Sequence, residues 1–228
     1  MYEKYFKRVF DIICALAAII VFWWLYIVVA GLVCIKLGKP VIFKQPRPGL
    51  NGKIFFLYKF RTMTNECDEN GKLLPDDVRL TRFGRILRAT SLDELPEAFN
   101  ILKGDMSVVG PRPQLVRDMV FFTQEQMKRQ SVKPGLSGLA QISGRNGITW
   151  EEKINYDLDY IKNITFIGDI KIIILTVWRA FVKQDGVNQE GMDTAEDLGD
   201  YLLRNGKVSR EEYEEKQKNS LEIIEEIV

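Results

Sequence analysis

Hydrophobic and charged positions divide the chain into one long apolar run near the N-terminus and a mixed remainder. Residues 12–35 carry no charged side chain, and these 24 positions are enough, at about 1.5 Å per helical residue, to cross a hydrocarbon core of about 30 Å. A cleavable signal peptide is the alternative, but the run is long and ends without a clear small-residue cleavage site. We therefore predict an N-terminal membrane helix over residues 1–36.

Basic residues flank this run on both sides, so the rule that positive charges stay in the cytoplasm does not select a direction for it. They are Lys4, Lys7 and Arg8 before the run and Lys36, Lys39, Lys44 and Arg47 after it. A segment that enters and leaves by the same membrane face would show this pattern. Trp23 and Trp24 also favour the interface over the bilayer centre, where a straight helix would place them. We predict a re-entrant helix, and a simple spanning helix is the alternative.

Beyond the apolar run, the pattern predicts short strands and several helices. Residues 41–44 and 54–63 have the character of strands, with two turn segments between them, a proline-rich one from residue 45 and Asn51-Gly52. Helical spacing predicts helices over residues 92–102, 114–130 and 150–161, with a glycine-rich loop over 133–147. Residues 167–182 are apolar but interrupted by charges, which is typical of an amphipathic helix at a membrane interface or on a protein core.

Together these elements predict a mixed α/β fold, mainly helical, with short strands, an N-terminal membrane helix and interfacial amphipathic helices. We divide the chain into the membrane helix at 1–36, the principal domain at 37–190 and a polar C-terminal tail at 191–228. A capped helix begins near Ser209 in this tail. The tail is interpreted as solvated, and partner binding or self-association into a homo-oligomer is the alternative.

The complete absence of histidine restricts the chemistry more than any other feature of the composition. It excludes Ser-His and Cys-His nucleophile pairs, histidine metal ligands and histidine general bases. Cys14 and Cys34 lie inside the apolar run, so with Cys67 they support neither a disulfide framework nor a zinc site. A net charge of +1 gives no indication of nucleic-acid binding. Catalysis must use carboxylates, Lys, Arg, Tyr or a metal held by oxygen ligands.

The densest group of candidate residues follows Arg85 and Arg88 and centres on Asp93 and Glu94. One interpretation is structural, because Ser91 and Glu94 have the spacing of a helix capping box, and acids are favoured in a first helical turn. The other is chemical. A carboxylate can attack phosphorus to give an acyl phosphate, and its neighbour can hold Mg²⁺, which takes oxygen ligands. The pattern alone leaves both interpretations open.

Basic residues in restricted settings suggest a polyanionic substrate. Lys59 and Arg61 are two positions apart in a predicted strand, so their side chains should lie on one face. Arg112 is held between two prolines, and Arg145 follows Gly144, where backbone N–H groups can approach an anion. Each residue alone is more often a surface charge, but the set fits phosphate binding.

These residues carry a resemblance to the monotopic phosphoglycosyl transferases, the bacterial sugar transferase family. It covers about residues 7–190, and the order of its motifs is far more specific than any one of them. The matching segments are Lys7-Arg8-x-Phe10-Asp11, Gln45-x-Arg47-Pro48-Gly49, Tyr58-Lys59-Phe60-Arg61-Thr62-Met63, Ser91-Leu92-Asp93-Glu94-Leu95-Pro96, Asn100-x-Leu102-Lys103-Gly104-Asp105-Met106-Ser107, Val109-Gly110-Pro111-Arg112-Pro113, Lys133-Pro134-Gly135-Leu136-Ser137-Gly138 and Ser143-Gly144-Arg145-Asn146.

The resemblance implies a covalent transfer in two steps, catalysed by the domain at 37–190. Asp93 would attack the β-phosphate of a UDP-sugar and expel UMP, and polyprenol (undecaprenyl) phosphate would then take the phosphosugar from Asp93. Glu94 would act beside it and hold Mg²⁺. The predicted substrate-binding residues are Lys59, Arg61, Arg88, Arg112 and Arg145, with Asp157 and Asp169 as polar supports.

The same resemblance implies a place and a role in the cell. We expect the enzyme at the bacterial inner membrane, in contact with the lipid bilayer, with its catalytic domain facing the cytoplasm. There it would start the assembly of a glycan or exopolysaccharide. A non-catalytic membrane module that binds polyisoprenoid or nucleotide sugar, and an ordinary glycosyltransferase that releases UDP, are the alternatives.

One segment departs from the family pattern. The membrane helix of this family is typically broken near its middle by Ser-Pro, which makes it re-entrant. Here the corresponding place is Phe22-Trp23-Trp24-Leu25, without proline. A re-entrant helix would therefore need another cause for its bend.

Overall fold

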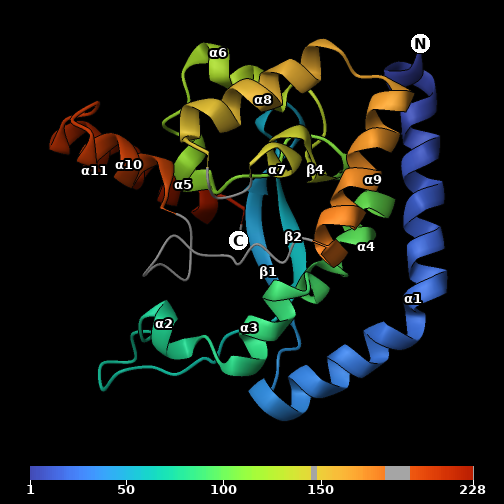
Figure 1. Cartoon of the computed structure of the whole chain (residues 1–228). Helices are drawn as coiled ribbons and strands as arrows, with labels where there is room; N and C mark the ends of the chain where they lie inside the picture. Colours follow the sequence, from blue (N-terminus) through green and yellow to red (C-terminus); the bar gives the residue numbers. More distant parts are fainter. Residues whose placement is uncertain (145–147, 183–195, 228) are drawn as a thin grey trace.

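The structure, a computed structural model, describes residues 1–144, 148–182 and 196–227. It is mainly helical, with two small sheets, as the sequence predicts (Figure 1). The α-helices are α1 (Lys7–Leu37), α2 (Asp76–Arg79), α3 (Arg82–Ala89), α4 (Glu97–Lys103), α5 (Val116–Met119), α6 (Gln124–Met127), α7 (Leu139–Ser143), α8 (Trp150–Lys162), α9 (Phe166–Val182), α10 (Leu198–Arg204) and α11 (Arg210–Glu225). The strands are β1 (Ile42–Pro48), β2 (Ile54–Phe60), β3 (Ser107–Val109) and β4 (Gly135–Ser137).

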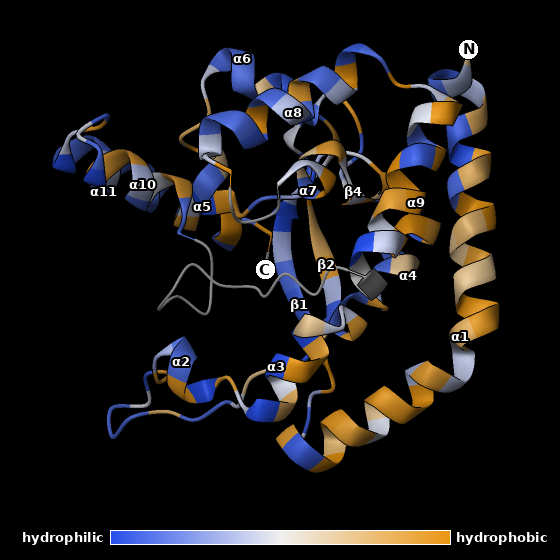
Figure 2. Cartoon of the chain, in the orientation of Figure 1, coloured by the Kyte–Doolittle hydropathy of each residue, from blue (hydrophilic) through white to orange (hydrophobic). Residues whose placement is uncertain are grey.

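Helix α1 is one long apolar helix that could anchor the chain in a membrane. By length and composition it is the one candidate for a membrane span in the described part of the chain. Figure 2 shows it hydrophobic along most of its length, and its exposed side chains include Ile13, Ile20, Trp23, Trp24 and Ile27. This outer surface would have no favourable contact with water.

The same helix is bent near its middle into two arms (Figure 1). It contains no proline, so the usual kink is absent. The arms pack on different parts of the domain: Ala15 joins a core with Leu57 and Met106, whereas Val29 and Val33 join a second core on the other side. The bend thus accompanies a division of the helix's contacts between two cores.

Strands β1 and β2 form an antiparallel hairpin that pairs Ile42 with Phe60 and Pro48 with Ile54. The first strand was expected to end at residue 44, and this boundary is wrong. The sheet has two strands, so β1 has a free edge, and the proline nitrogens of Pro46 and Pro48 need no partner there. Of the two predicted turn segments, Asn51-Gly52 is confirmed, with Asn51 at a left-handed φ of 54°, whereas residues 45–48 belong to β1. The second strand also ends early, at Phe60 rather than residue 63.

Two predicted helices are interrupted. Residues 92–102 form a 3₁₀ turn, η3 (Leu92–Glu94), followed by α4, because Pro96 precedes the first residue of α4 and cannot continue a helix from η3. Residues 114–130 form α5, α6 and a further 3₁₀ turn, η4 (Lys128–Gln130), instead of one helix. Thr123 begins α6 by accepting a hydrogen bond from the Gln126 N–H, and this cap separates α6 from α5.

The glycine-rich residues 133–147 were predicted as loop, but they contain β4 and α7. Strand β4 pairs in parallel with β3, joining Ser107 to Gly135 and Val109 to Ser137. The two backbones approach so closely that a Cβ built on Gly135 would lie 2.1 Å from the Gly110 nitrogen. Glycine is therefore required here for contact between the strands.

The remaining predicted helices are confirmed. Helices α8 and α9 match residues 150–161 and 167–182 within one residue at each end, and Ser209 caps α11. Helix α10 was not predicted. The C-terminal helices pack on the domain, where Leu198 joins a core with Phe121 and Trp150.

Candidate active site

The conformation of Ser91 sets the position of the two adjacent carboxylates. Ser91 has a φ of 54°, which is left-handed and unusual for a residue with a side chain, and its hydroxyl makes no capping hydrogen bond. The capping-box interpretation is therefore wrong. Asp93 is 7% exposed and takes part in no hydrogen bond or ion pair within the described residues. Asp93 is thus a largely buried residue whose carboxylate has no partner in the described part of the chain.

Glu94 is held by two cations from different elements. Its Oε1 accepts from Lys59 Nζ of β2 at 2.7 Å and from Arg112 Nη2, in the Pro111–Pro113 segment, at 2.5 Å. These contacts bring together three predicted site residues, which are up to 53 positions apart in sequence, from Lys59 to Arg112. Oε2 of Glu94 has no hydrogen bond among the described residues.

A third carboxylate, which sequence reasoning missed, completes this cluster. Glu97, at the start of α4, is 1% exposed, and its Oε1 lies 3.2 Å from Lys59 Nζ without a hydrogen bond. Its neighbour Asn100 locks α4 to β2, accepting from the Tyr58 N–H at 3.0 Å and donating to the Phe56 carbonyl at 2.7 Å. The only sequence signal for Glu97 was its distance from Asp93, one helical turn.

Burial and mutual repulsion separate the pKa values of the three carboxyls. Burial, followed by the charge of Glu94, raises the pKa of Asp93 to about 6. The same causes raise the pKa of Glu97 to about 7. Although burial opposes it, the charges of Arg112 and Lys59 hold the pKa of Glu94 well below its usual range. At neutral pH Glu94 is therefore ionised and Asp93 is mostly ionised. Glu97 is near the midpoint of its titration, so a large fraction of it is protonated.

A second set of contacts positions the cations. Arg88 of α3 donates from Nε to the Thr62 hydroxyl at 3.1 Å, and its charge lowers the pKa of Asp93. Arg129 is 3% exposed and donates to the backbone carbonyl of Arg112 at 2.7 Å. Asp157 accepts from Arg129 at 2.6 Å. Asp157 thus supports the Arg112 segment through Arg129, without reaching the carboxylate cluster itself.

Helix α1 also contacts the site. The Tyr26 hydroxyl donates to the Leu95 carbonyl at 2.6 Å, directly after the two carboxylates. The Tyr26 ring packs edge-on against Phe99 of α4 at 5.8 Å between centroids. Helix α1 therefore packs through Tyr26 against the turn that carries Asp93 and Glu94.

Besides Asp157, three predicted site residues are not placed in this cluster. Arg61 is buried and donates to the carbonyls of Leu37 and Lys39, so it closes the C-terminal end of α1. Asp169 is fully buried at the N-terminal end of α1, where it accepts from Lys7 at 2.6 Å. Arg145 lies outside the described residues.

The donor set fits a hard cation. The described residues contain no group of three Asp, Glu, His or Cys side chains placed to hold a metal alone. Mg²⁺, however, commonly takes one or two carboxylates, with water and substrate phosphates completing its shell. Glu94 Oε2 and the two Asp93 oxygens provide such ligands. The cluster combines an unpaired buried carboxylate with neighbouring cations, which suits attack on a phosphate ester.

Comparisons of the sequence with known proteins find one matching family and several relatives. The sequence model of the family described as "Bacterial sugar transferase" matches residues 2–183. The chain is 49% identical over 190 residues to an uncharacterized sugar transferase, EpsL, of Bacillus subtilis, covering 83% of this chain and 94% of the relative.

Two larger relatives carry more specific names. The chain is 43% identical to the UDP-glucose:undecaprenyl-phosphate glucose-1-phosphate transferase of Klebsiella pneumoniae, over 78% of this chain and 41% of the relative. It is 36% identical to the undecaprenyl-phosphate galactose phosphotransferase of Salmonella typhimurium, over 81% of this chain and 42% of the relative. The chain thus spans about two fifths of each of these two proteins.

Proposed function

The chain belongs to the bacterial sugar transferase family, and from that premise we propose that it transfers a phosphosugar from a UDP-sugar to undecaprenyl phosphate, releasing UMP. The observation that carries the proposal is Asp93, a buried carboxylate with no partner, one residue from a carboxylate held by two cations. Relatives named as sugar-phosphate transferases supply the substrate class. In the cell this reaction would start exopolysaccharide or capsule assembly.

The proposed first step forms a bond between an Asp93 oxygen and the β-phosphorus. The bond from that phosphorus to the bridging oxygen breaks, and UMP leaves with the electron pair. Arg88, Lys59 and Arg112 neutralise charge on the diphosphate. Glu94 would hold Mg²⁺, and the ion would supply further charge neutralisation at the diphosphate.

In the proposed second step, a phosphate oxygen of undecaprenyl phosphate attacks the same phosphorus. The bond from phosphorus to Asp93 breaks, and the carboxylate is restored. Neither step requires a proton to be added or removed, which agrees with the absence of histidine. The proposed mechanism does require that Asp93, although buried, is ionised before it attacks.

For the membrane we propose a re-entrant α1 whose two ends face the cytoplasm. The bend in Figure 1 and the basic residues at both ends support this topology. The contact from Tyr26 to Leu95 places the catalytic turn beside the apolar helix, where a lipid-linked acceptor would arrive. A cysteine placed at Glu3, in a variant lacking the native cysteines, should resist an impermeant maleimide in intact cells. Labelling before lysis would contradict the topology and leave the chemistry untouched.

Released nucleotide tests the reaction itself. We expect purified protein with UDP-sugar and undecaprenyl phosphate to release UMP, and EDTA to abolish this release. Release of UDP would show transfer of the sugar without phosphate, as by an ordinary glycosyltransferase. The absence of any nucleotide release across UDP-sugars would favour a non-catalytic binding module.

A further inference from the structure

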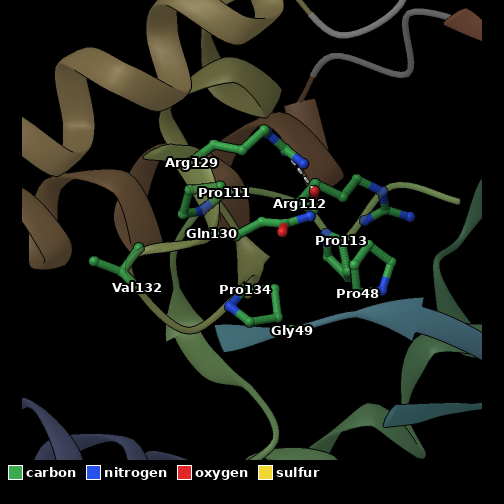
Figure 3. A pocket seen from close by; sticks show the side chains of 9 residues that line it. All are labelled: Pro48, Gly49, Pro111, Arg112, Pro113, Arg129, Gln130, Val132 and Pro134. Carbon is green, nitrogen blue, oxygen red and sulfur yellow. Dashed lines mark hydrogen bonds between the residues drawn. The ribbon is translucent and has the colours of Figure 1, made fainter. Parts of the chain in front are cut away.

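The tripeptide Pro-Arg-Pro occurs twice in the sequence, at residues 46–48 and at residues 111–113. The first copy ends β1, and the second copy follows β3 and carries Arg112. The ring of each proline fixes its φ at about −65°, which stiffens both segments. Proline rings of both copies line one small pocket, together with Arg129 and Gln130 of η4 (Figure 3). The two stiff segments therefore lie next to each other.

All three carbonyls of the second copy, residues 111–113, accept hydrogen bonds, each from a different element. The carbonyl of its first proline accepts from the Gly135 N–H of β4 at 2.9 Å. The Arg112 carbonyl accepts from Arg129 Nη2 of η4 at 2.7 Å, which is the dashed line in Figure 3. The carbonyl of its second proline accepts from Arg47 Nη1 of β1 at 3.2 Å. Three elements thus fasten the backbone that carries Arg112.

Arg47 makes this contact from an unfavourable position. It is half-buried, and its Nη2 donates to Gln45 Oε1 at 2.8 Å, so neither of its two acceptors is a carboxylate. Burial, followed by the charge of Arg112, lowers the pKa of Arg47 to about 10, which leaves it charged at neutral pH. A buried charge beside a like charge destabilises a fold. A contribution to stability therefore does not explain an arginine at this position.

We propose that Arg47 is a positioning residue for Arg112, because it fixes the backbone from which the Arg112 guanidinium reaches Glu94 and the diphosphate. The Arg112 side chain is 38% exposed, so its guanidinium can meet a ligand while Nη2 donates to Glu94 at 2.5 Å. Binding is weaker when a segment must first be ordered, and a backbone held at all three carbonyls avoids this loss. The inference rests on the proposed function, in which Arg112 neutralises charge on the diphosphate.

The binding of UDP, measured without turnover, tests this role. Arg47→Met removes the donors and keeps the apolar stem of the side chain. We expect it to weaken UDP binding about tenfold, as for the loss of a hydrogen bond from a charged donor. Isothermal titration calorimetry on the full chain in detergent measures the affinity. Lys53→Met, which removes an exposed charge from the turn of the same hairpin, is the matched control and should bind UDP as wild type does.

A double-mutant cycle separates positioning from a direct contact or a general loss of stability. Arg112→Met alone should weaken UDP binding. Adding Arg47→Met should then weaken it no further, because the side chain that Arg47 positions is already gone. Losses that multiply would overturn the inference, since Arg47 would then bind the nucleotide itself or act through the fold as a whole. Unchanged UDP affinity in Arg47→Met would overturn it as well.

Arg47→Lys decides the question if the methionine variant does not fold. Lysine keeps the charge, but its ammonium cannot reproduce the forked pair of hydrogen bonds to the Pro113 carbonyl and Gln45. We expect Arg47→Lys to lose affinity for UDP, and to lose none when Arg112 is already methionine. Wild-type affinity in Arg47→Lys would show that the charge alone suffices, and this would overturn the inference.

Failure of this inference and failure of the proposed function are distinguishable. Release of UMP by Arg47→Met with the wild-type kcat and the wild-type KM for UDP-sugar would overturn the role of Arg47 and leave the reaction intact. Coupled losses of UDP affinity in a protein that releases no nucleotide would support the role of Arg47 and contradict the reaction.

Discussion

Two buried aspartates in this protein have opposite surroundings. Asp169 is fully buried, and both of its oxygens are satisfied: Oδ2 accepts from Lys7 and Tyr2, and Oδ1 accepts from Tyr160 at 2.8 Å. Asp93 is almost as buried, yet it has no hydrogen bond or ion pair within the described residues. A saturated carboxylate holds the N-terminal end of α1 in place, whereas an unsaturated carboxylate is available to react.

Two other buried aspartates, Asp11 and Asp118, also accept hydrogen bonds from the protein. Asp11 accepts from the Ser107 hydroxyl and the Val108 N–H, each at 2.9 Å, and so joins α1 to β3. Asp118 accepts from the Leu198 N–H at 2.9 Å and so joins α5 to α10. Burial alone therefore does not distinguish the carboxylates of the candidate site in this chain. Burial together with an oxygen that has no hydrogen bond among the described residues and with nearby cations does, and it selects Asp93 and Glu97.

The largest expected effect is the loss of turnover in Asp93→Asn. The amide is a poor nucleophile, so transfer should fall by about 10³-fold or more while the fold and membrane binding are retained. Nucleotide release measures the loss of transfer, and circular dichroism on the same preparation checks that the fold is retained. The matched control is Asp159→Asn, an exposed acid of α8 that should leave turnover unchanged. Substantial transfer by Asp93→Asn would show that another group attacks.

Asp169→Asn should lose stability but keep its turnover, the reverse of Asp93→Asn. Removing this charge leaves Lys7 buried without a counter-ion, which we expect to lower the free energy of unfolding by about 3 kcal/mol. Turnover per folded molecule, measured below the melting transition, should stay close to wild type. A normal melting temperature combined with a defect in substrate binding would place Asp169 in the substrate site instead.

A smaller effect should appear in the stability of Asp93→Asn against pH. The pKa of Asp93 is raised from 3.8 to about 6, so the folded state binds the proton more tightly than the unfolded state. Ionisation between these values destabilises the fold, by roughly 3 kcal/mol at most. The variant should therefore melt higher than wild type at pH 8, and the difference should vanish near pH 4. Identical melting curves at both pH values would contradict an unpaired buried Asp93.

The same titration predicts the smallest change, in the pH profile of wild-type turnover. Asp93 must be ionised to attack, so the rate should fall as pH drops through about 6. Replacing Lys59 with Met removes a charge that lowers this pKa, so the fall should move to higher pH. A profile that is flat from pH 5 to pH 8 would show that Asp93 does not limit the rate.

The sequence was informative wherever residues act in contiguous motifs. Asp93, Glu94 and the Arg112 segment were found because their motifs are short, ordered and rich in chemistry. Glu97 was missed because only the packing of α4 against β2 buries it and brings it beside Lys59. Arg61 was assigned to one face with Lys59, but β2 ends between them at Phe60, so the side chains diverge.

The fold shows the same contrast between elements that local sequence determines and elements that depend on contacts between distant segments. Helices α8 and α9 have clear periodicity and were predicted nearly to the residue. Strands β3 and β4 have three residues each, and their pairing depends on contacts between distant segments. The cap at Thr123 was visible in the sequence, but the apolar spacing on both sides of it suggested one continuous helix.

The central claim is that Asp93 becomes covalently attached to the phosphosugar, and intact-mass analysis tests it most directly. Wild-type protein incubated with its UDP-sugar and Mg²⁺, without lipid acceptor, should gain the mass of one phosphosugar. That mass should map to the peptide containing Asp93, disappear when undecaprenyl phosphate is added, and never form on Asp93→Asn. Unmodified wild-type protein under single-turnover conditions that still yield the lipid product would contradict the account.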